Sequence, residues 1–171
     1  MKTLITYSSK TGNTKKVAEA ILTAIPNAEL KDINDVLYLD YDLIILGGWI
    51  DRATFDSKSL NFAKKLKKKK VAYFFTLGAH PNSDHAKDCV NNIETLLVEN
   101  NNEIIGKYFC QGAIDPKLIS WMSTLPTDHK MHPSEERKQR WKDAASHPNN
   151  FDLENTTKTF IEIYNKLKSL S

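Results

Sequence analysis

The chain has 171 residues, 40% hydrophobic and 26% charged, and 24 Lys and Arg against 21 Asp and Glu give a net charge of +3. This composition excludes disordered and fibrous proteins, and the length predicts a single domain spanning residues 1–171. The charge is too small to indicate nucleic-acid binding. No apolar run reaches the roughly 18 to 20 residues that cross a bilayer, so membrane insertion is not expected either. A signal peptide is not evident and there are only two cysteines, Cys89 and Cys110, so we expect a cytoplasmic protein with free thiols.

Apolar segments rich in strand-forming residues alternate with helical patterns along the chain. Strands are predicted at residues 2–7, 29–33, 42–46, 71–76 and 103–110. Helices are predicted after the first strand up to Pro26, at residues 86–97 and at residues 152–170. The alternation indicates an α/β fold with a doubly wound, five-stranded parallel sheet.

Residues 114–150 interrupt this alternation, because they contain no strand pattern. Asp115-Pro116 is a good helix start, and so is Pro133 followed by Glu135 and Glu136. Extra helices are therefore expected at about residues 116–123 and 133–146, before the last helix.

Glycines gather at one edge of the predicted sheet. Five of the six, all except Gly106, follow directly on the carboxyl ends of predicted strands or lie in the turn beyond. In open α/β sheets this edge is where ligands bind, so the candidate site is expected there.

The first strand-to-helix turn has the chemistry of a phosphate site. Hydroxyl, amide and glycine residues follow Tyr7, and the candidate phosphate-binding residues are Ser9, Lys10, Thr11, Gly12, Asn13 and Thr14. Free N–H groups and the positive end of a helix dipole would add to these donors. Neither a Walker loop nor a dinucleotide fingerprint is present. The alternative is a hydroxyl-rich helix cap without a ligand.

Three groups of residues give the sequence a resemblance to the flavodoxin family. The first is the aromatic, hydroxyl and small-residue pattern of Tyr7, Ser9, Gly12, Thr14 and Ala18, from which Thr6 departs because the family usually has an apolar residue there. The chain also resembles a flavodoxin-like subgroup that has a motif after each of the last three strands. These motifs are Gly47, Trp49, Asp51, Arg52 and Thr54 after the third strand, residues 76–79 after the fourth and residues 110–112 after the fifth. The resemblance covers nearly the whole chain.

The resemblance implies strand order 2-1-3-4-5 and an FMN cofactor whose phosphate lies on residues 9–14. The ring would lie between the loops after the third and fourth strands, with Trp49 against one face. In electron-carrying flavodoxins, a tyrosine from the loop after the fourth strand usually covers the other face of the ring, and this chain has no tyrosine in that loop. The remaining candidate cofactor residues are Gly48, Ile50, Asp51, Arg52, Leu77, Gly78, Ala79 and His80.

Two functions follow from the resemblance. The first is an electron carrier that serves a redox partner protein, with the extra helices as part of the docking face. The alternative is an FMN-dependent enzyme acting on a planar anionic ligand such as haem or a bilin, in which His129 and His132 are candidate haem ligands. No other metal site is expected.

Overall fold

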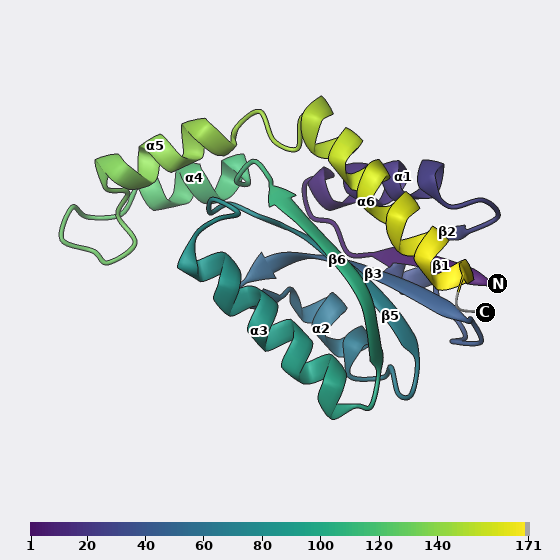
Figure 1. Cartoon of the computed structure of the whole chain (residues 1–171). Coiled ribbons are helices and arrows are strands. Elements are labelled where there is room, and N and C mark those ends of the chain that lie inside the picture. The colour runs from purple at the N-terminus through teal and green to yellow at the C-terminus, as the bar shows by residue number, and fades with distance from the viewer. Residues whose placement is uncertain (170–171) are drawn as a thin grey trace.

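Five parallel strands form the centre of the fold in the computed structural model, which describes residues 1–169. Their order across the sheet is β2-β1-β3-β5-β6, and the short β4 pairs antiparallel with the end of β3 (Figure 1). The strands are β1 (Thr3–Tyr7), β2 (Glu29–Asp32), β3 (Leu43–Asp51), β4 (Thr54–Phe55), β5 (Lys70–Leu77) and β6 (Glu103–Gln111). The predicted doubly wound α/β fold and its order of parallel strands are confirmed.

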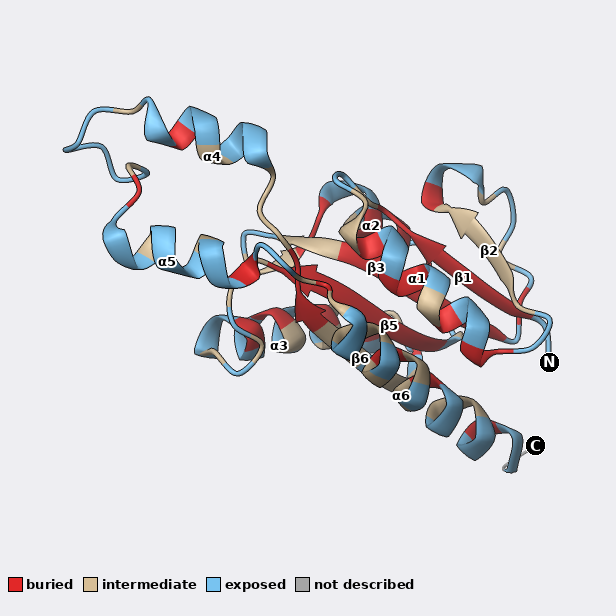
Figure 2. Ribbon diagram, turned by 90° about the horizontal axis from the view of Figure 1, so that it is seen from above, coloured by how far each residue is buried: buried red, intermediate tan, exposed pale blue. Residues whose placement is uncertain are grey.

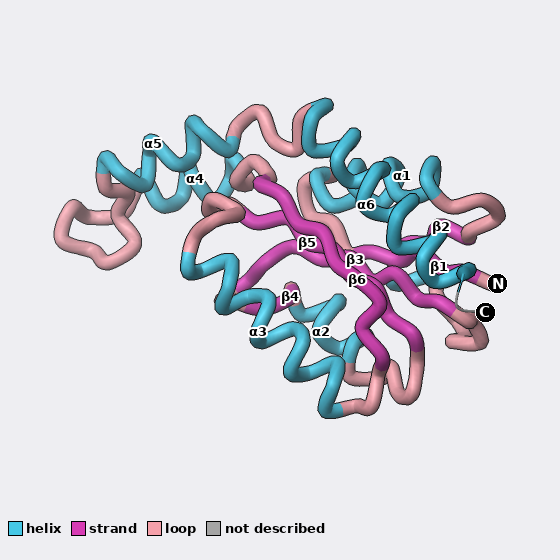
Figure 3. Tube along the Cα trace, in the orientation of Figure 1, coloured by secondary structure: helices cyan, strands magenta, loops and turns pink. Residues whose placement is uncertain are grey.

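Helices cover both faces of the sheet (Figure 3). One face packs against α1 and α6, and the other against α2 and α3. The helices are α1 (Asn13–Ala24), α2 (Ser57–Ala63), α3 (Asp84–Glu99), α4 (Pro116–Ser123), α5 (Glu135–Ala144) and α6 (Asn150–Ser169), with a short 3-10 helix at Ile33–Asp35. The last predicted helix reached Leu170, which lies outside the described residues.

The central strands are buried on both sides, as their continuous apolar sequence predicts. Side chains of β5 alternate between the two cores, with Tyr73 and Phe75 facing α2 and α3 and Phe74 facing α1 and α6. On the second face the rings of Phe74 and Phe160 meet edge to face, with centroids 6.4 Å apart. Cys89 and Cys110 are both buried, and neither is in a disulfide.

The third strand is longer than the sequence predicted. Residues 47–51 were expected in a loop, but β3 continues through them and turns at Arg52 and Ala53 into β4. Gly47 and Gly48 therefore lie inside a strand, where neighbouring side chains require them. A Cβ at Gly47 would overlap the ring of Phe74, and one at Gly48 would lie 2.6 Å from Phe55 Cδ1.

Residues 113–149 project from the sheet as an arm that contains α4 and α5 (Figures 1 and 2). Most of the arm is exposed, and its two ends meet at the sheet, where the Ala113 N–H donates to the His147 carbonyl (2.9 Å). The predicted bounds of α4 are confirmed. The second predicted helix is shorter, because Ser134 is its cap and accepts a hydrogen bond from the Arg137 N–H.

Among residues 1–169, no helix has both the length and the apolar character that a membrane span requires.

Removing the ring of Phe160 is expected to destabilise the fold. This side chain is fully buried, so Phe160→Ala should lower the free energy of unfolding by about 3–5 kcal/mol through lost burial and a cavity beside Phe74. Phe151 on the same helix is 69% exposed, and Phe151→Ala should change stability by less than about 0.5 kcal/mol. Urea denaturation of both variants measures the difference, and equal losses would contradict this description of the core.

Candidate functional site

The turn between β1 and α1 is shaped to present backbone donors. Gly12 caps α1 with φ +96°, a left-handed conformation that glycine adopts without strain. The turn is anchored at its start, where the Ser8 N–H donates to the Gly47 carbonyl (3.2 Å), and is closed by the Gly12 N–H on Ser9 Oγ (3.1 Å). We call residues 9–14 the phosphate loop.

The N-terminus of α1 has no side-chain cap, and its first turn contains no acidic residue. In contrast, side-chain oxygens accept backbone N–H groups at the starts of α2, α3, α4 and α5. The first hydrogen bond within α1 runs from the Lys16 N–H to the Gly12 carbonyl. Within the described part of the chain, the N–H groups of residues 9–11 and 13–15 have no acceptor. This end of the helix is therefore a set of unused donors with a positive dipole.

Side chains of the phosphate loop join it to the neighbouring strand ends. Thr14 Oγ1 and Thr76 Oγ1 are 2.9 Å apart and buried. Asn13 Nδ2 donates to the Ala113 carbonyl (3.0 Å), at the point where the arm leaves β6. The loop, the end of β5 and the base of the arm thus form one hydrogen-bonded unit.

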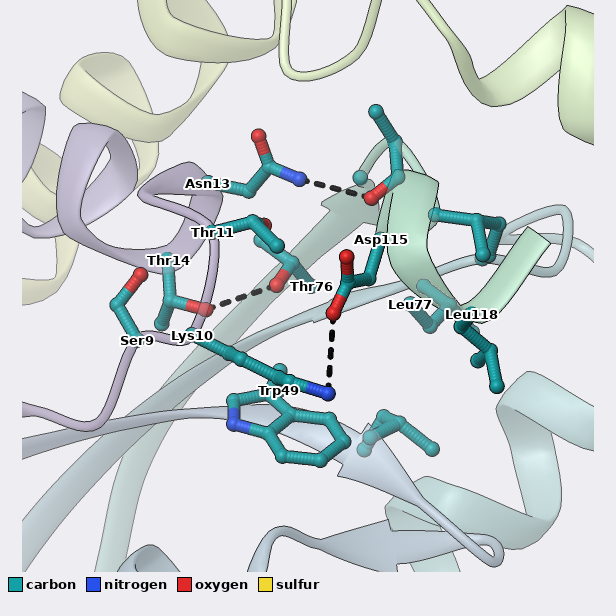
Figure 4. A pocket seen from close by; sticks show the side chains of 15 residues that line it. Ser9, Lys10, Thr11, Asn13, Thr14, Trp49, Thr76, Leu77, Asp115 and Leu118 are labelled. Carbon is teal, nitrogen blue, oxygen red and sulfur yellow. Dashed lines mark hydrogen bonds and ion pairs between the residues drawn. The ribbon is translucent and has the colours of Figure 1, made fainter. Parts of the chain in front are cut away.

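A pocket of about 130 Å³ opens between these elements (Figure 4). We call it the carboxyl-edge pocket. Nine residues predicted from the sequence line it, from the phosphate loop and from the ends of β3 and β5: Ser9, Lys10, Thr11, Asn13, Thr14, Trp49, Ile50, Leu77 and Gly78. Six further lining residues are not among those predicted from the sequence: Thr76, Gly112, Ala113, Ile114, Asp115 and Leu118. Thr76 and Gly112 belong to the subgroup motifs, so the motifs could have indicated them.

Lys10 and Asp115 form an ion pair across the pocket. Lys10 Nζ lies 3.0 Å from Asp115 Oδ2 and 5.9 Å from the centroid of the Trp49 ring, within cation–π range (Figure 4). The Asp115 carboxylate also caps α4 by accepting the Lys117 N–H (2.9 Å). These two hydrogen bonds, the cap first and Lys10 second, lower the pKa of Asp115, so it is a carboxylate at neutral pH.

Six predicted residues do not line the pocket. Gly12 allows the left-handed backbone conformation of the turn but does not face the pocket. Gly48 packs against the α2 side of the sheet. Asp51 and Arg52 are exposed at the turn of the β3–β4 hairpin, and neither lines the pocket. Ala79 is half-buried outside the lining, and His80 is exposed, with its Nδ1 accepting the Asn82 N–H (3.2 Å).

The candidate haem ligands lie in the arm, between α4 and α5. His129 is exposed and its Nδ1 accepts the Met131 N–H (3.0 Å). His132 is half-buried, with Nδ1 2.8 Å from the Leu125 carbonyl. Neither residue lines the carboxyl-edge pocket, and residues 1–169 contain no group of three His, Cys, Asp or Glu side chains arranged to hold a metal ion.

The donor set fits a flavin mononucleotide. A phosphate dianion needs several N–H and O–H donors, which the uncapped helix and the loop hydroxyls supply. Trp49, half-buried beside them, offers a flat apolar face for a planar ring.

The sequence comparisons agree with this chemistry. Residues 4–162 match a family model described as a flavodoxin domain, and the chain belongs to this family. FMN is accordingly its cofactor. The chain is also 37% identical over 120 residues to the flavodoxin-like domain-containing protein BilS of Clostridioides difficile (strain CD3), an alignment that covers 67% of this chain and 68% of that protein.

Solved structures share the fold at low sequence identity. Flavodoxin 2 from Bacillus cereus superposes with a TM-score of 0.61 at 19% identity, over 97% of this chain and 99% of the other. A flavodoxin from the domain Archaea gives a TM-score of 0.58 at 18% identity, over 98% and 99% of the two chains. These likenesses establish the architecture alone.

Proposed function

We propose that the chain holds FMN in the carboxyl-edge pocket and passes electrons from it to a partner protein. The phosphate would lie on the uncapped start of α1 and the hydroxyls of residues 9–14, and the ring would lie beside Trp49. The support for this assignment is chemical, because the loop gathers unused N–H donors and no acidic side chain.

The observation that carries the choice of carrier over enzyme is the pocket's lack of a free acid or base. The ionisable side chains that line it are Lys10 and Asp115, and they are paired with each other. Burial raises the pKa of the Cys89 thiol to about 11 and raises that of the Cys110 thiol as well, so neither is a thiolate at neutral pH. Proton transfer to a bound substrate would need a group that this pocket does not offer.

The position of the pocket supports the same choice. It lies at the carboxyl edge of the sheet, and its lining includes the exposed residues Lys10 and Thr11. A flavin bound there would keep an exposed edge, which suits electron transfer to a docked protein.

Each part of the chain has a separate task in this proposal. Bound FMN supplies the electron chemistry. The phosphate loop binds and orients the phosphate, Trp49 covers one face of the ring and excludes water, and the mildly basic surface sets which partners can dock. The projecting arm, next to the pocket mouth, is proposed as part of the docking face.

The phosphate assignment predicts that an acidic residue in the loop will block FMN. Thr11 is exposed at the pocket, so Thr11→Glu should leave the fold intact and weaken FMN binding at least about tenfold, through repulsion of the phosphate. Thr95→Glu, at an exposed position on α3, is the control. Fluorescence titration of the apoprotein measures both dissociation constants, and native affinity in Thr11→Glu would refute the loop assignment.

The ring assignment predicts a specific role for Trp49. Trp49→Ala should weaken FMN binding by about 1 kcal/mol, or roughly fivefold in Kd, and should restore much of the flavin fluorescence that the stacked indole quenches. The matched control is Trp121→Ala, because Trp121 is 49% exposed on α4 and does not line the pocket. Equal behaviour of the two variants would remove Trp49 from the ring site.

Anaerobic mixing separates the carrier from the enzyme. The reduced holoprotein should transfer electrons to cytochrome c, a one-electron acceptor protein, and should leave the tetrapyrrole rings of haemin and of a bilin intact, so that haemin shows at most the band shift of ferric-to-ferrous reduction. Loss of the tetrapyrrole absorption coupled to flavin reoxidation, and abolished by changing both His129 and His132 to Ala, would instead establish the alternative enzyme.

A further inference from the structure

We propose that the arm supplies the second wall of the flavin pocket, with Leu118 of α4 as its main apolar contact to the ring. This inference rests on the proposed FMN site and adds to it the face that Trp49 does not cover. The β5–α3 loop, where the sequence lacks the tyrosine usual in the family, would then leave this task to a segment about 35 residues further along the chain.

The lining of the pocket is the first support. Beyond Leu77 and Gly78, no residue of the β5–α3 loop within the described chain lines the pocket, and His80 is exposed outside it. Ile114, Asp115 and Leu118 line it from the arm. Figure 4 shows Asp115 and Leu118 on the side of α4, with the Lys10 side chain passing over the Trp49 ring toward Asp115.

Close packing holds the start of the arm against the end of β5. A Cβ at Gly78 would overlap Ile114 Cδ1, so the isoleucine lies directly on the backbone at this point. The Gly112 N–H donates to the Leu77 carbonyl (2.9 Å) just before the arm begins. The start of the arm therefore has a fixed position at the pocket, and α4 begins two residues after Ile114.

Two residues of the phosphate loop hold the arm in the same place. Asn13 Nδ2 donates to the Ala113 carbonyl (3.0 Å), and Lys10 pairs with Asp115 at 3.0 Å. The Lys10 amine also lies over the Trp49 ring, so its side chain would have to move along the ring edge for a flavin to stack there. Asp115 is in turn the cap of α4, so its carboxylate fixes the start of the helix that carries Leu118. The loop that binds the phosphate and the helix that would meet the ring are thus joined by direct contacts.

The side chain of Leu118 leaves apolar surface exposed inside the pocket. It is 39% exposed although it lines a pocket, whereas Met122, one turn further along α4, is 4% exposed. A planar aromatic ligand in the pocket would cover this apolar surface and gain the free energy of its burial.

Riboflavin provides the test, because it has the ring of FMN without the phosphate. Dissociation constants of riboflavin and FMN should be measured by fluorescence titration for the native apoprotein and for Leu118→Ala, Leu118→Met and Trp49→Ala.

The control is Val98→Ala, since Val98 is 59% exposed on α3 and does not line the pocket. Leu118→Ala should weaken both ligands by the same factor, about fivefold, because the lost contact is to the ring they share. Leu118→Met, which keeps the apolar volume, should bind as the native protein does.

The outcomes are separable. Native affinity in Leu118→Ala together with weakened binding in Trp49→Ala would overturn the arm as second wall and leave the FMN site standing. Native affinity in both variants would overturn the wall and the ring site together. A loss in Leu118→Ala that affects FMN and spares riboflavin would also contradict the proposal, since it would place Leu118 near the phosphate.

Discussion

The uncapped N-terminus of α1 is the constraint on which the rest of the site depends. Six N–H groups in and beside this turn have no acceptor within the described part of the chain, and the turn directly follows a fully buried strand. Gly12 makes the turn possible and the Ser8 N–H anchors it. An anion at this point would satisfy these donors, which is why we propose it as the phosphate site.

The same loop ties the site to the arm. Lys10 of the phosphate loop forms an ion pair with Asp115, and Asn13 donates a hydrogen bond to the Ala113 carbonyl. Both partners lie at the start of the arm. The second end of the arm is fixed there too, because the Ala113 N–H donates to the His147 carbonyl. The sheet thus supplies the rigid platform, and a projecting segment held at both ends lies beside the pocket. Such an arrangement places an exposed segment next to the proposed cofactor site without disturbing the core.

The sequence predicted the strands and helices that depend on residues close together in the chain. Continuous apolar runs marked the central strands, and Asp115-Pro116 marked the start of α4, because burial and helix capping leave direct patterns in the residues. The β3–β4 hairpin was missed because its turn, Arg52-Ala53, has positive φ at both residues without the usual Gly or Asn. A distant contact supports this turn, since Asn92 Nδ2 of α3 donates to the Ala53 carbonyl (2.9 Å).

The missed site residues have a similar explanation. The phosphate loop is contiguous, so its residues could be read from the chain directly. Asp115 and Leu118 reach the pocket because of the direction in which the arm leaves β6, which depends on packing at Gly78 and on a side chain about 100 residues away. Helical periodicity shows that α4 exists and not where it points.

Phosphorus NMR of the bound cofactor tests the central claim most directly. Free FMN changes its phosphate shift with a pKa of about 6. If the uncapped helix and the loop hydroxyls hold the phosphate, they favour the dianion, and the shift of bound FMN should stay constant from about pH 5.5 to 8.5. A bound phosphate that titrates as free FMN does would contradict the account, because the anion would then lie in solvent and not on the start of α1.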